Sequence, residues 1–284
     1  MKQWIRRGLM SLCLLLCLAV LLVCSSDSNL GRWTYYLPET VEFNGQDIEV
    51  DSTLERSALE EDSFSQDEDG TLSYSGEALY GIDLSAHQGE VDWAAVAESG
   101  VDFAMLRAGY RGYGSGQIAE DSQFANNLAG AQGAGLQVGV YFFSQAITVE
   151  EAQEEAAFVL ELLDGQPLDL PIAYDWEYIT YDDARTDSLD AETVTACAAA
   201  FCAVIESAGY DAMVYCNGEL GYLNYDLSQL QDYEVWYAEY ADSPSFAYAI
   251  AMWQYSSSGT VSGIDGEVDL DIWFLPEETE AEEK

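Results

Sequence analysis

The sequence predicts an α/β fold, a flattened β/α barrel of about eight mainly parallel strands with an incomplete set of helices. Between residues 79 and 275, short and nearly continuous apolar runs recur, which is typical of parallel strands covered on both faces. Helical patterns alternate with several of these runs, as they do in barrel folds. Roughly 195 residues are few for eight complete units, and the connections between the last runs are short. A doubly wound open sheet is the alternative arrangement.

Eight apolar runs are predicted as strands. In chain order they read LYGIDLS, DFAMLRAG, LQVGVYFF, LPIAYDWE, DAMVYC, YEVWYAEY, YAIAMWQY and GEVDLDIWF. Two segments are predicted as helices, TVEEAQEEAAFVLELL and DAETVTACAAAFCAVIESAG. Thr148 and Glu151 predict a capping box at the start of the first helix, and Gly209 predicts the end of the second.

The first 26 residues predict a signal peptide or an N-terminal membrane anchor. Lys2, Arg6 and Arg7 precede an uncharged apolar run over residues 8–24. This run is longer than a usual signal core, and no A-x-A cleavage site follows it, so we favour a retained anchor. We therefore expect the rest of the chain to be extracytoplasmic.

Composition divides the remaining chain into three segments. Residues 27–77 are acidic and Ser-rich and are predicted to be a spacer. The barrel domain is expected over residues 78–275, and an acidic tail over residues 276–284. The net charge of -43, from 9 Lys and Arg against 52 Asp and Glu, argues against nucleic-acid binding by the surface.

The cysteines and the single histidine predict neither a disulfide framework nor a metal site. Outside the apolar run there are only three cysteines, Cys197, Cys202 and Cys216, and an odd number excludes complete pairing. We expect them to be buried free thiols. With His87 as the only histidine and no paired C-x-x-C motif, zinc ligands are lacking, and no metal or cofactor is expected.

The motif LPIAYDWEYI places two carboxylates at the end of an apolar strand. Asp175 and Glu177 are two residues apart, so they project from the same face. Asp83 ends the first predicted strand, and Asp269 and Asp271 lie on the eighth, which neighbours the first in a closed barrel. These acids are therefore expected to meet at one mouth of the barrel, the rim where barrel enzymes place their chemistry.

Few basic residues are present to neutralise such a cluster. Between residues 79 and 275 they are Arg107, Arg111 and Arg185. A carboxyl group crowded by other acids is pushed toward its protonated form near neutral pH, as a general acid for glycosidic cleavage requires. A Ser-His-Asp triad is disfavoured because no G-x-S-x-G motif accompanies His87, and no phosphate-binding loop is present.

Several separated motifs resemble the glycoside hydrolases of family 25. They read YGIDLSAHQGEVDW, FAMLRAGYRGYG, EDSQFANNLAGAQGAGLQVGVYFF, LPIAYDWE, VWYAEY and MWQYSSSGTVSGIDGEVDLD, over about residues 79–275. The resemblance implies a modified, flattened β/α barrel and the activity of a lysozyme, or N-acetylmuramidase. Such an enzyme hydrolyses the β-1,4 bond between N-acetylmuramic acid and N-acetylglucosamine in the glycan strands of peptidoglycan. The resemblance also implies retention of configuration, with the acetamide of the substrate as nucleophile.

The resemblance assigns a role to each acid of the cluster. Glu177 is expected to be the general acid and base, and Asp175 to orient the acetamide or stabilise its charge. Asp83 and Asp269 are expected to complete the cluster and to tune its protonation.

Further expectations concern the residues around the cluster. Tyr141, Trp236 and Tyr110 are candidates for sugar contacts, although each could equally be packing, and Gln254 is expected to give structural support. Two other functions stay open at this stage. One is a non-catalytic peptidoglycan-binding protein, and the other is a hydrolase of another acetamido-sugar polymer such as chitin.

Overall fold

The computed structural model describes residues 39–67 and 72–276. Its contacts divide the chain into two compact units, with the boundary between residues 50 and 51 in the sequence. In the first unit, β1 (Thr40–Phe43) and β2 (Gln46–Glu49) form an antiparallel hairpin. Asn44 and Gly45 both have positive φ, as the two-residue turn of such a hairpin requires. The predicted anchor over residues 1–26 lies outside the described residues. No helix within the described ranges is long and apolar enough to cross a membrane.

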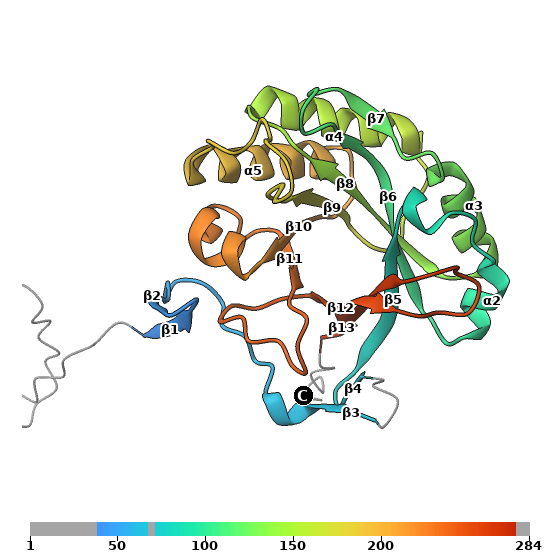
Figure 1. Cartoon of the computed structure of the whole chain (residues 1–284), viewed down its shortest axis with the longest axis horizontal. Coiled ribbons are helices and arrows are strands. Elements are labelled where there is room, and N and C mark those ends of the chain that lie inside the picture. The colour runs from blue at the N-terminus through green and yellow to red at the C-terminus, as the bar shows by residue number, and fades with distance from the viewer. Residues whose placement is uncertain (1–38, 68–71, 277–284) are drawn as a thin grey trace, which may run out of the picture. The chain divides into compact units, whose positions relative to one another are not determined.

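The second unit contains a closed barrel of eight strands (Figure 1). They are β5 (Ala78–Leu84), β6 (Phe103–Arg111), β8 (Gln137–Ser144), β9 (Ile172–Trp176), β10 (Ala212–Asn217), β11 (Glu234–Ala238), β12 (Met252–Gly259) and β13 (Val268–Phe274). The order around the barrel is β5-β13-β12-β11-β10-β9-β8-β6, and the pairing of β5 with β6 closes it. All eight predicted strands are confirmed, and closure excludes the open sheet.

One strand of the barrel runs against the others. β5, β6, β8, β9, β10, β11 and β12 form parallel pairs, whereas β13 is antiparallel to both β12 and β5. The amino end of β13 therefore lies at the rim where the other strands have their carboxyl ends. A short additional strand, β7 (Ile118–Glu120), pairs antiparallel with the end of β6.

Helices cover only part of the barrel. They are α2 (Trp93–Glu98), α3 (Phe124–Ala134), α4 (Val149–Leu163) and α5 (Ala191–Ser207). α3 and α4 pack on β6 and β8, and α5 packs on β9 and β10. In the described residues after α5, only a π-helical turn at Leu220–Asn224 and a 3-10 turn at Leu227–Gln229 occur. The predicted incomplete set of helices is confirmed.

The predicted start and end signals of the two helices are present, but one hydrogen bond at the first helix differs from the prediction. The Thr148 hydroxyl accepts a hydrogen bond from the backbone N–H of Glu151 at 3.2 Å, as an N-cap should. The Glu151 carboxylate, however, accepts from the N–H of Ile147 at 2.9 Å, one residue before the cap. The second predicted helix ends as expected, with Gly209 at φ 90°.

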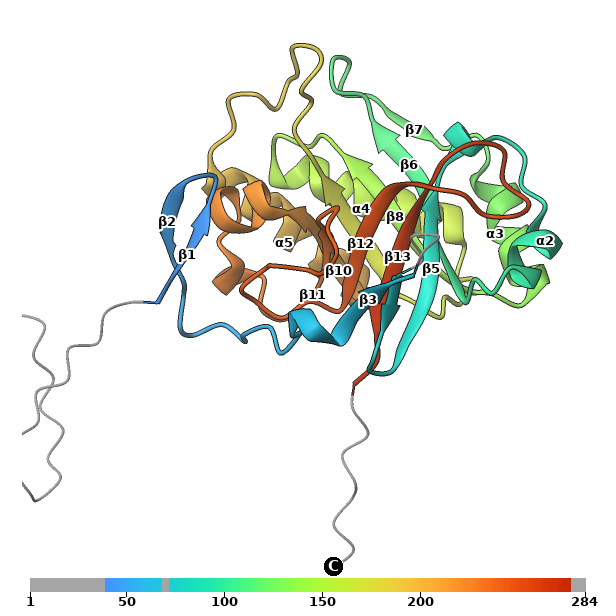
Figure 2. The same ribbon diagram turned by 60° about the horizontal axis from the view of Figure 1, so that its bottom comes forward.

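Part of the segment predicted as a spacer is folded onto the barrel. Residues 51–67 and 72–77 belong to the second unit, where β3 (Phe64–Gln66) and β4 (Leu72–Tyr74) form a hairpin. The Phe64 ring meets those of Trp253 and Phe274 with centroids 5.3 and 6.1 Å apart. Aromatic packing thus covers a face of β12 and β13 that no described helix covers, and Figure 2 shows β3 lying against these strands.

Apolar and aromatic side chains fill the interior of the barrel, with Tyr141, Tyr215 and Trp236 toward the carboxyl ends of the parallel strands. The buried cluster consists of Phe103, Met105, Tyr141, Leu170, Ala173, Met213, Tyr215, Trp236, Ala238 and Met252. Trp236 meets Tyr141 and Tyr215 edge-on, with centroids 5.8 and 5.0 Å apart. A Cβ at Gly81 would lie 2.3 Å from the Phe103 ring, so this position has no room for a side chain. The filled interior supports the polar rim above it.

Candidate active site

Asp83 and Asp269 lie side by side at the mouth of the barrel. Asp83 is near the carboxyl end of β5, and Asp269 is the second residue of β13. Because β13 is antiparallel, its start meets the end of β5, and these two residues are register partners. A hydrogen bond links their carboxyl groups. The convergence predicted for these acids is therefore present, although it depends on the reversed direction of β13.

Below this pair, Asp271 and Gln254 continue the polar layer into the barrel. Asp271 is fully buried and accepts a hydrogen bond from the indole N–H of Trp236 at 2.8 Å. Gln254, its register partner on β12, donates to Asp83 Oδ2 at 2.6 Å and accepts from the Tyr215 hydroxyl at 3.1 Å. Gln254 thus fixes the Asp83 carboxyl, consistent with the structural support expected of it.

The D-x-E pair stands across the mouth on β9. Asp175 is a register partner of Tyr215 on β10 and of Phe143 on β8, and it is 6% exposed. Glu177 follows the last residue of the strand and is half-buried. Asp175 Oδ1 is buried and has no hydrogen-bond partner within residues 39–67 and 72–276. An ionised carboxylate in that position would be costly, so the neutral form of Asp175 is favoured.

Burial and mutual repulsion raise the pKa values of these acids. The pKa of Glu177 rises to about 7, mainly because its carboxyl is buried and secondly because of Asp269. Burial raises the pKa of Asp83 well above its usual range, with Asp271 adding to the effect. The pKa of Asp175 is raised in the same way, by burial first and by Glu177 second. The cluster therefore retains protons at neutral pH.

The arginines of the barrel domain bind acids outside the cluster. Arg107 is the one that influences it, because its charge opposes the rise in the pKa of Asp175. Its Nε is nevertheless bound to Asp121 at 2.8 Å. Asp121 also accepts from the backbone N–H of Ala86 at 3.0 Å, just after β5. The acids at the mouth consequently have no guanidinium salt bridge within the described residues.

The three predicted sugar contacts occupy different environments. Tyr141 and Trp236 are 8% and 1% exposed and lie in the aromatic layer inside the barrel. Their rings therefore have almost no surface open to a sugar, and their contacts are those of core residues. Tyr110, at the end of β6, is 37% exposed and lies under the guanidinium of Arg107, 5.5 Å from its ring centroid.

Two residues that were not selected from the sequence contact the site. Tyr240 is 60% exposed, and its hydroxyl donates to Gln254 Oε1 at 3.0 Å. Gln145 is fully buried and donates from Nε2 to the backbone carbonyl of Glu177 at 2.8 Å. Gln145 directly follows the end of β8, and Tyr240 lies two residues after the end of β11, so a position at the carboxyl end of a strand was the sequence signal for both.

Nothing in the described chain suggests metal or thiol chemistry. Cys197, Cys202 and Cys216 are buried and free, as predicted, and burial raises their pKa values. No group of three or more metal-ligating side chains occurs within residues 39–67 and 72–276. His87 is exposed in the 3-10 turn Ala86–Gln88, where its backbone N–H donates to the hydroxyl of Ser85 at 3.2 Å.

The barrel domain is the part of the chain that resembles known proteins. A model of the family described as glycosyl hydrolases family 25 matches residues 82–264. An autolytic lysozyme of Clostridium acetobutylicum is 31% identical over 194 residues, which are 68% of this chain and 55% of that protein. The chain thus spans about half the length of that lysozyme. The uncharacterized protein YegX of Escherichia coli O157:H7 is 26% identical over 206 residues, 70% of this chain and 71% of that protein.

Solved structures share the fold. The modular autolysin LytC of Streptococcus pneumoniae, solved with a synthetic peptidoglycan ligand, has a TM-score of 0.63 at 24% identity, covering 86% of this chain and 55% of that one. The spore cortex lytic enzyme SleM of Clostridium perfringens has a TM-score of 0.60 at 24% identity, covering 70% and 67% of the two chains. At these identities, the likeness supports the barrel architecture.

Proposed function

Because the chain belongs to the glycosyl hydrolases of family 25, we propose that it hydrolyses the β-1,4 bond between N-acetylmuramic acid and N-acetylglucosamine in peptidoglycan. The observation that carries this proposal is the cluster of carboxyl groups at the barrel mouth, whose pKa values are raised and which form no salt bridge with any described residue. Within it, Glu177 has a pKa of about 7, which suits a group that must give and then take a proton near neutral pH.

In the first step, Glu177 donates its proton to the glycosidic oxygen as the bond from that oxygen to C1 of the muramic acid breaks. The carbonyl oxygen of the substrate's own acetamide attacks C1 from the opposite face, which gives an oxazolinium ion and releases the N-acetylglucosamine end. In the second step, the Glu177 carboxylate removes a proton from water while the water oxygen attacks C1 and reopens the ring. Two inversions at C1 retain the configuration.

Asp175 assists the acetamide in this proposal. It lies two residues before Glu177 on the same strand face, so both carboxyl groups face one sugar linkage. Its carboxyl accepts a hydrogen bond from the acetamide N–H and so orients the acetamide for attack, which the neutral form of Asp175 can do through its carbonyl oxygen. Asp83 and Asp269, joined to each other and to Gln254, repel negative charge and hold protons in the cluster.

The proposed substrate implies an extracytoplasmic site of action. The apolar run over residues 8–24, which lies outside the described residues, would keep the enzyme at the membrane surface as a retained anchor. An enzyme held there would reach only nearby glycan, which favours remodelling of the cell's own wall. The strongly negative chain would approach an anionic wall best at moderate salt, because salt screens exposed charges.

Mass spectrometry of digested peptidoglycan tests this function. Full-length protein should release fragments whose new reducing end is N-acetylmuramic acid, and Glu177→Gln should slow their release at least about 100-fold. Binding without any fragments would indicate a non-catalytic peptidoglycan-binding protein. Activity on chitin fragments with none on peptidoglycan would indicate a different acetamido-sugar polymer. Either result would contradict the proposal.

A further inference from the structure

Two loops stand together above the mouth of the barrel. One, residues 177–190, leads from β9 to α5, and the other, residues 112–117, leads from β6 to β7. Figure 2 shows both loops rising at the top, beyond the barrel strands. They are joined, since the backbone N–H of Arg185 donates to the carbonyl of Tyr113 at 3.0 Å and the Tyr113 hydroxyl donates to Asp182 at 3.2 Å.

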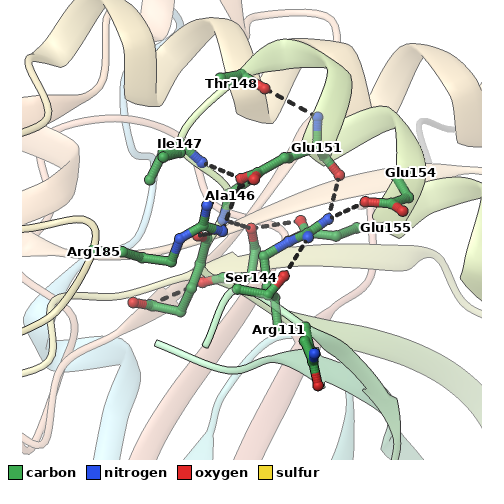
Figure 3. A network of polar contacts seen from close by, with 12 residues as sticks. Arg111, Ser144, Ala146, Ile147, Thr148, Glu151, Glu154, Glu155 and Arg185 are labelled. Atoms are coloured by element: carbon green, nitrogen blue, oxygen red, sulfur yellow. Dashed lines mark hydrogen bonds and ion pairs between the residues drawn. The ribbon is translucent and has the colours of Figure 1, made fainter. Parts of the chain in front are cut away.

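The longer loop is anchored to buried groups. Arg185 forms two hydrogen bonds to the carboxylate of Glu151, at 2.7 and 2.9 Å (Figure 3). The neighbouring Thr186 is fully buried, and its hydroxyl donates to Gln145 Oε1 at 2.9 Å. Through its Nε2, the same Gln145 holds the carbonyl of Glu177 at the start of the loop. Gln145 and the ion pair with Glu151 thus hold the loop at its start, Glu177, and again at Arg185 and Thr186.

An exposed tyrosine lies on this anchored loop. Tyr181 is 75% exposed, the highest value among the large hydrophobic side chains of the described residues. Its ring meets that of Tyr113 edge-on, with centroids 5.8 Å apart and planes at 88°. An edge contact of this kind leaves aromatic surface open to solvent. A large aromatic side chain that is already held in place loses little conformational freedom when a ligand binds to it.

The position of Tyr181 relates it to the carboxyl cluster. It follows Glu177 by four residues, so their Cα atoms are at most about 14 Å apart. A polymer cleaved at Glu177 must extend across the rim in both directions. The flat faces of sugar rings carry C–H groups that pack well on aromatic rings, whereas a strongly acidic surface offers little to the lactyl and peptide carboxylates.

We propose that Tyr113 and Tyr181 form a platform that binds a sugar ring of the glycan strand outside the bond being cleaved. This proposal rests on the proposed function and adds a subsite to it. The ring of Tyr181 takes the sugar, and Tyr113 supports it from the second loop. The platform would select long strands over short fragments, because a short fragment ends before it reaches the loop.

Steady-state kinetics of the full-length chain on two substrates tests the platform. One substrate is glycan strands stripped of peptide, and the other is a short muramic acid oligosaccharide that spans only the cleaved bond. Tyr181→Ala should raise KM on the strands about 3- to 10-fold, the range expected for losing one aromatic stacking contact. It should leave kcat, and both constants on the short substrate, unchanged. Tyr181→Trp should restore KM.

Leu223→Ala is the matched control, because Leu223 is another exposed apolar residue, at 46%, on the π-helical turn. The platform is excluded if Tyr181→Ala changes KM no more than this control, or if it lowers activity equally on both substrates. If Tyr181→Ala raises KM on strands with peptides attached, assayed as a third substrate, and not on peptide-free strands, the loop binds peptide and the proposal is overturned. If wild-type protein cleaves neither substrate, the proposed function fails. Affinity for peptide-free strands, measured by sedimentation, then tests the platform by itself.

Discussion

Two glutamates of this domain have the same raised pKa in opposite surroundings. Burial raises the pKa of both Glu155 and Glu177 to about 7. Glu155, on α4, accepts hydrogen bonds from Arg111 Nε and from the Ser144 hydroxyl, each at 2.6 Å (Figure 3). Glu177 has no such partner for its carboxyl in the described residues, and its neighbours at the barrel mouth are acids.

This contrast separates a structural acid from a chemical one. At Glu155, both oxygens are bonded to protein groups, so nothing is left for a substrate. Arg111 extends the structural network to Glu154 and to the carbonyls of Gly116 and Glu151. A shifted pKa therefore does not by itself identify a catalytic residue. The missing partners of Glu177, together with the rim position of the strand that carries it, make the difference.

Replacing Glu177 with Gln should have the largest effect on activity. Loss of the general acid and base should lower kcat about 10²- to 10⁴-fold, as measured by release of reducing sugar from peptidoglycan. The fold should persist, because an amide fits the same space and has no charge to bury. Near-normal turnover by a folded Glu177→Gln protein would remove Glu177 from the mechanism.

Replacing Glu155 with Gln should instead act on stability. The change leaves a buried guanidinium without its closest carboxylate, and breaking such a pair costs about 3 kcal/mol in the free energy of unfolding. Urea denaturation should show this loss, while activity per folded molecule stays within a few-fold of wild type. A large fall in kcat with unchanged stability would mean that the two glutamates do not differ as described.

The pH dependence of stability should distinguish wild type from Glu177→Gln. Since folding raises the pKa of Glu177 from about 4.5 to about 7, the native state binds more protons than the unfolded state between these values. The contribution of Glu177 to the free energy of unfolding is therefore fully present below pH 4.5 and is lost as the pH rises through 7. Glu177→Gln should be about 3 kcal/mol more stable than wild type at pH 8, and equal to it near pH 4. A constant difference at every pH would rule out this linkage.

The smallest effect is expected at Gln145. Gln145→Ala removes the donor that holds the Glu177 carbonyl and the acceptor of Thr186. It should lower kcat on the short oligosaccharide about 10-fold and shift the upper limb of the pH–rate profile, because the carboxyl of Glu177 is no longer held in place. Gln132→Ala is the control, since its side chain also donates to a backbone carbonyl, that of Pro167. Equal effects of the two variants would assign Gln145 a purely structural role.

Much of the fold followed from local sequence. Each of the eight strands is a short apolar run, and the two long helices carry cap residues at their ends. The reversed direction of β13 was not deduced. Its connection to β12, residues 260–267, is too short for the crossover that a parallel pair needs, which was the available signal. The packing of Phe64 and Tyr74 on the barrel had no local signal, because their partners are about 200 residues away.

The site residues that could be predicted from the sequence are those at the ends of strands. Asp83, Asp175 and Glu177 end parallel strands, so a barrel brings them to one rim. Trp236 and Tyr141 looked suited to sugars by residue type alone. Whether a strand residue points inside or outside the barrel depends on closure and register, and these rings point into the core. The hydrogen bonds of Gln145 connect three segments and could not be inferred from any one of them.

Carboxyl-carbon NMR of glutamate-labelled protein tests the state of Glu177 most directly. The signal lost in Glu177→Gln should titrate in wild type with a midpoint near pH 7, and a second such signal should be lost in Glu155→Gln. Addition of a glycan substrate analogue should move the midpoint of Glu177 and leave that of Glu155 in place. A midpoint for Glu177 near 4.5 would mean that its carboxyl is ionised at neutral pH and cannot act as the acid.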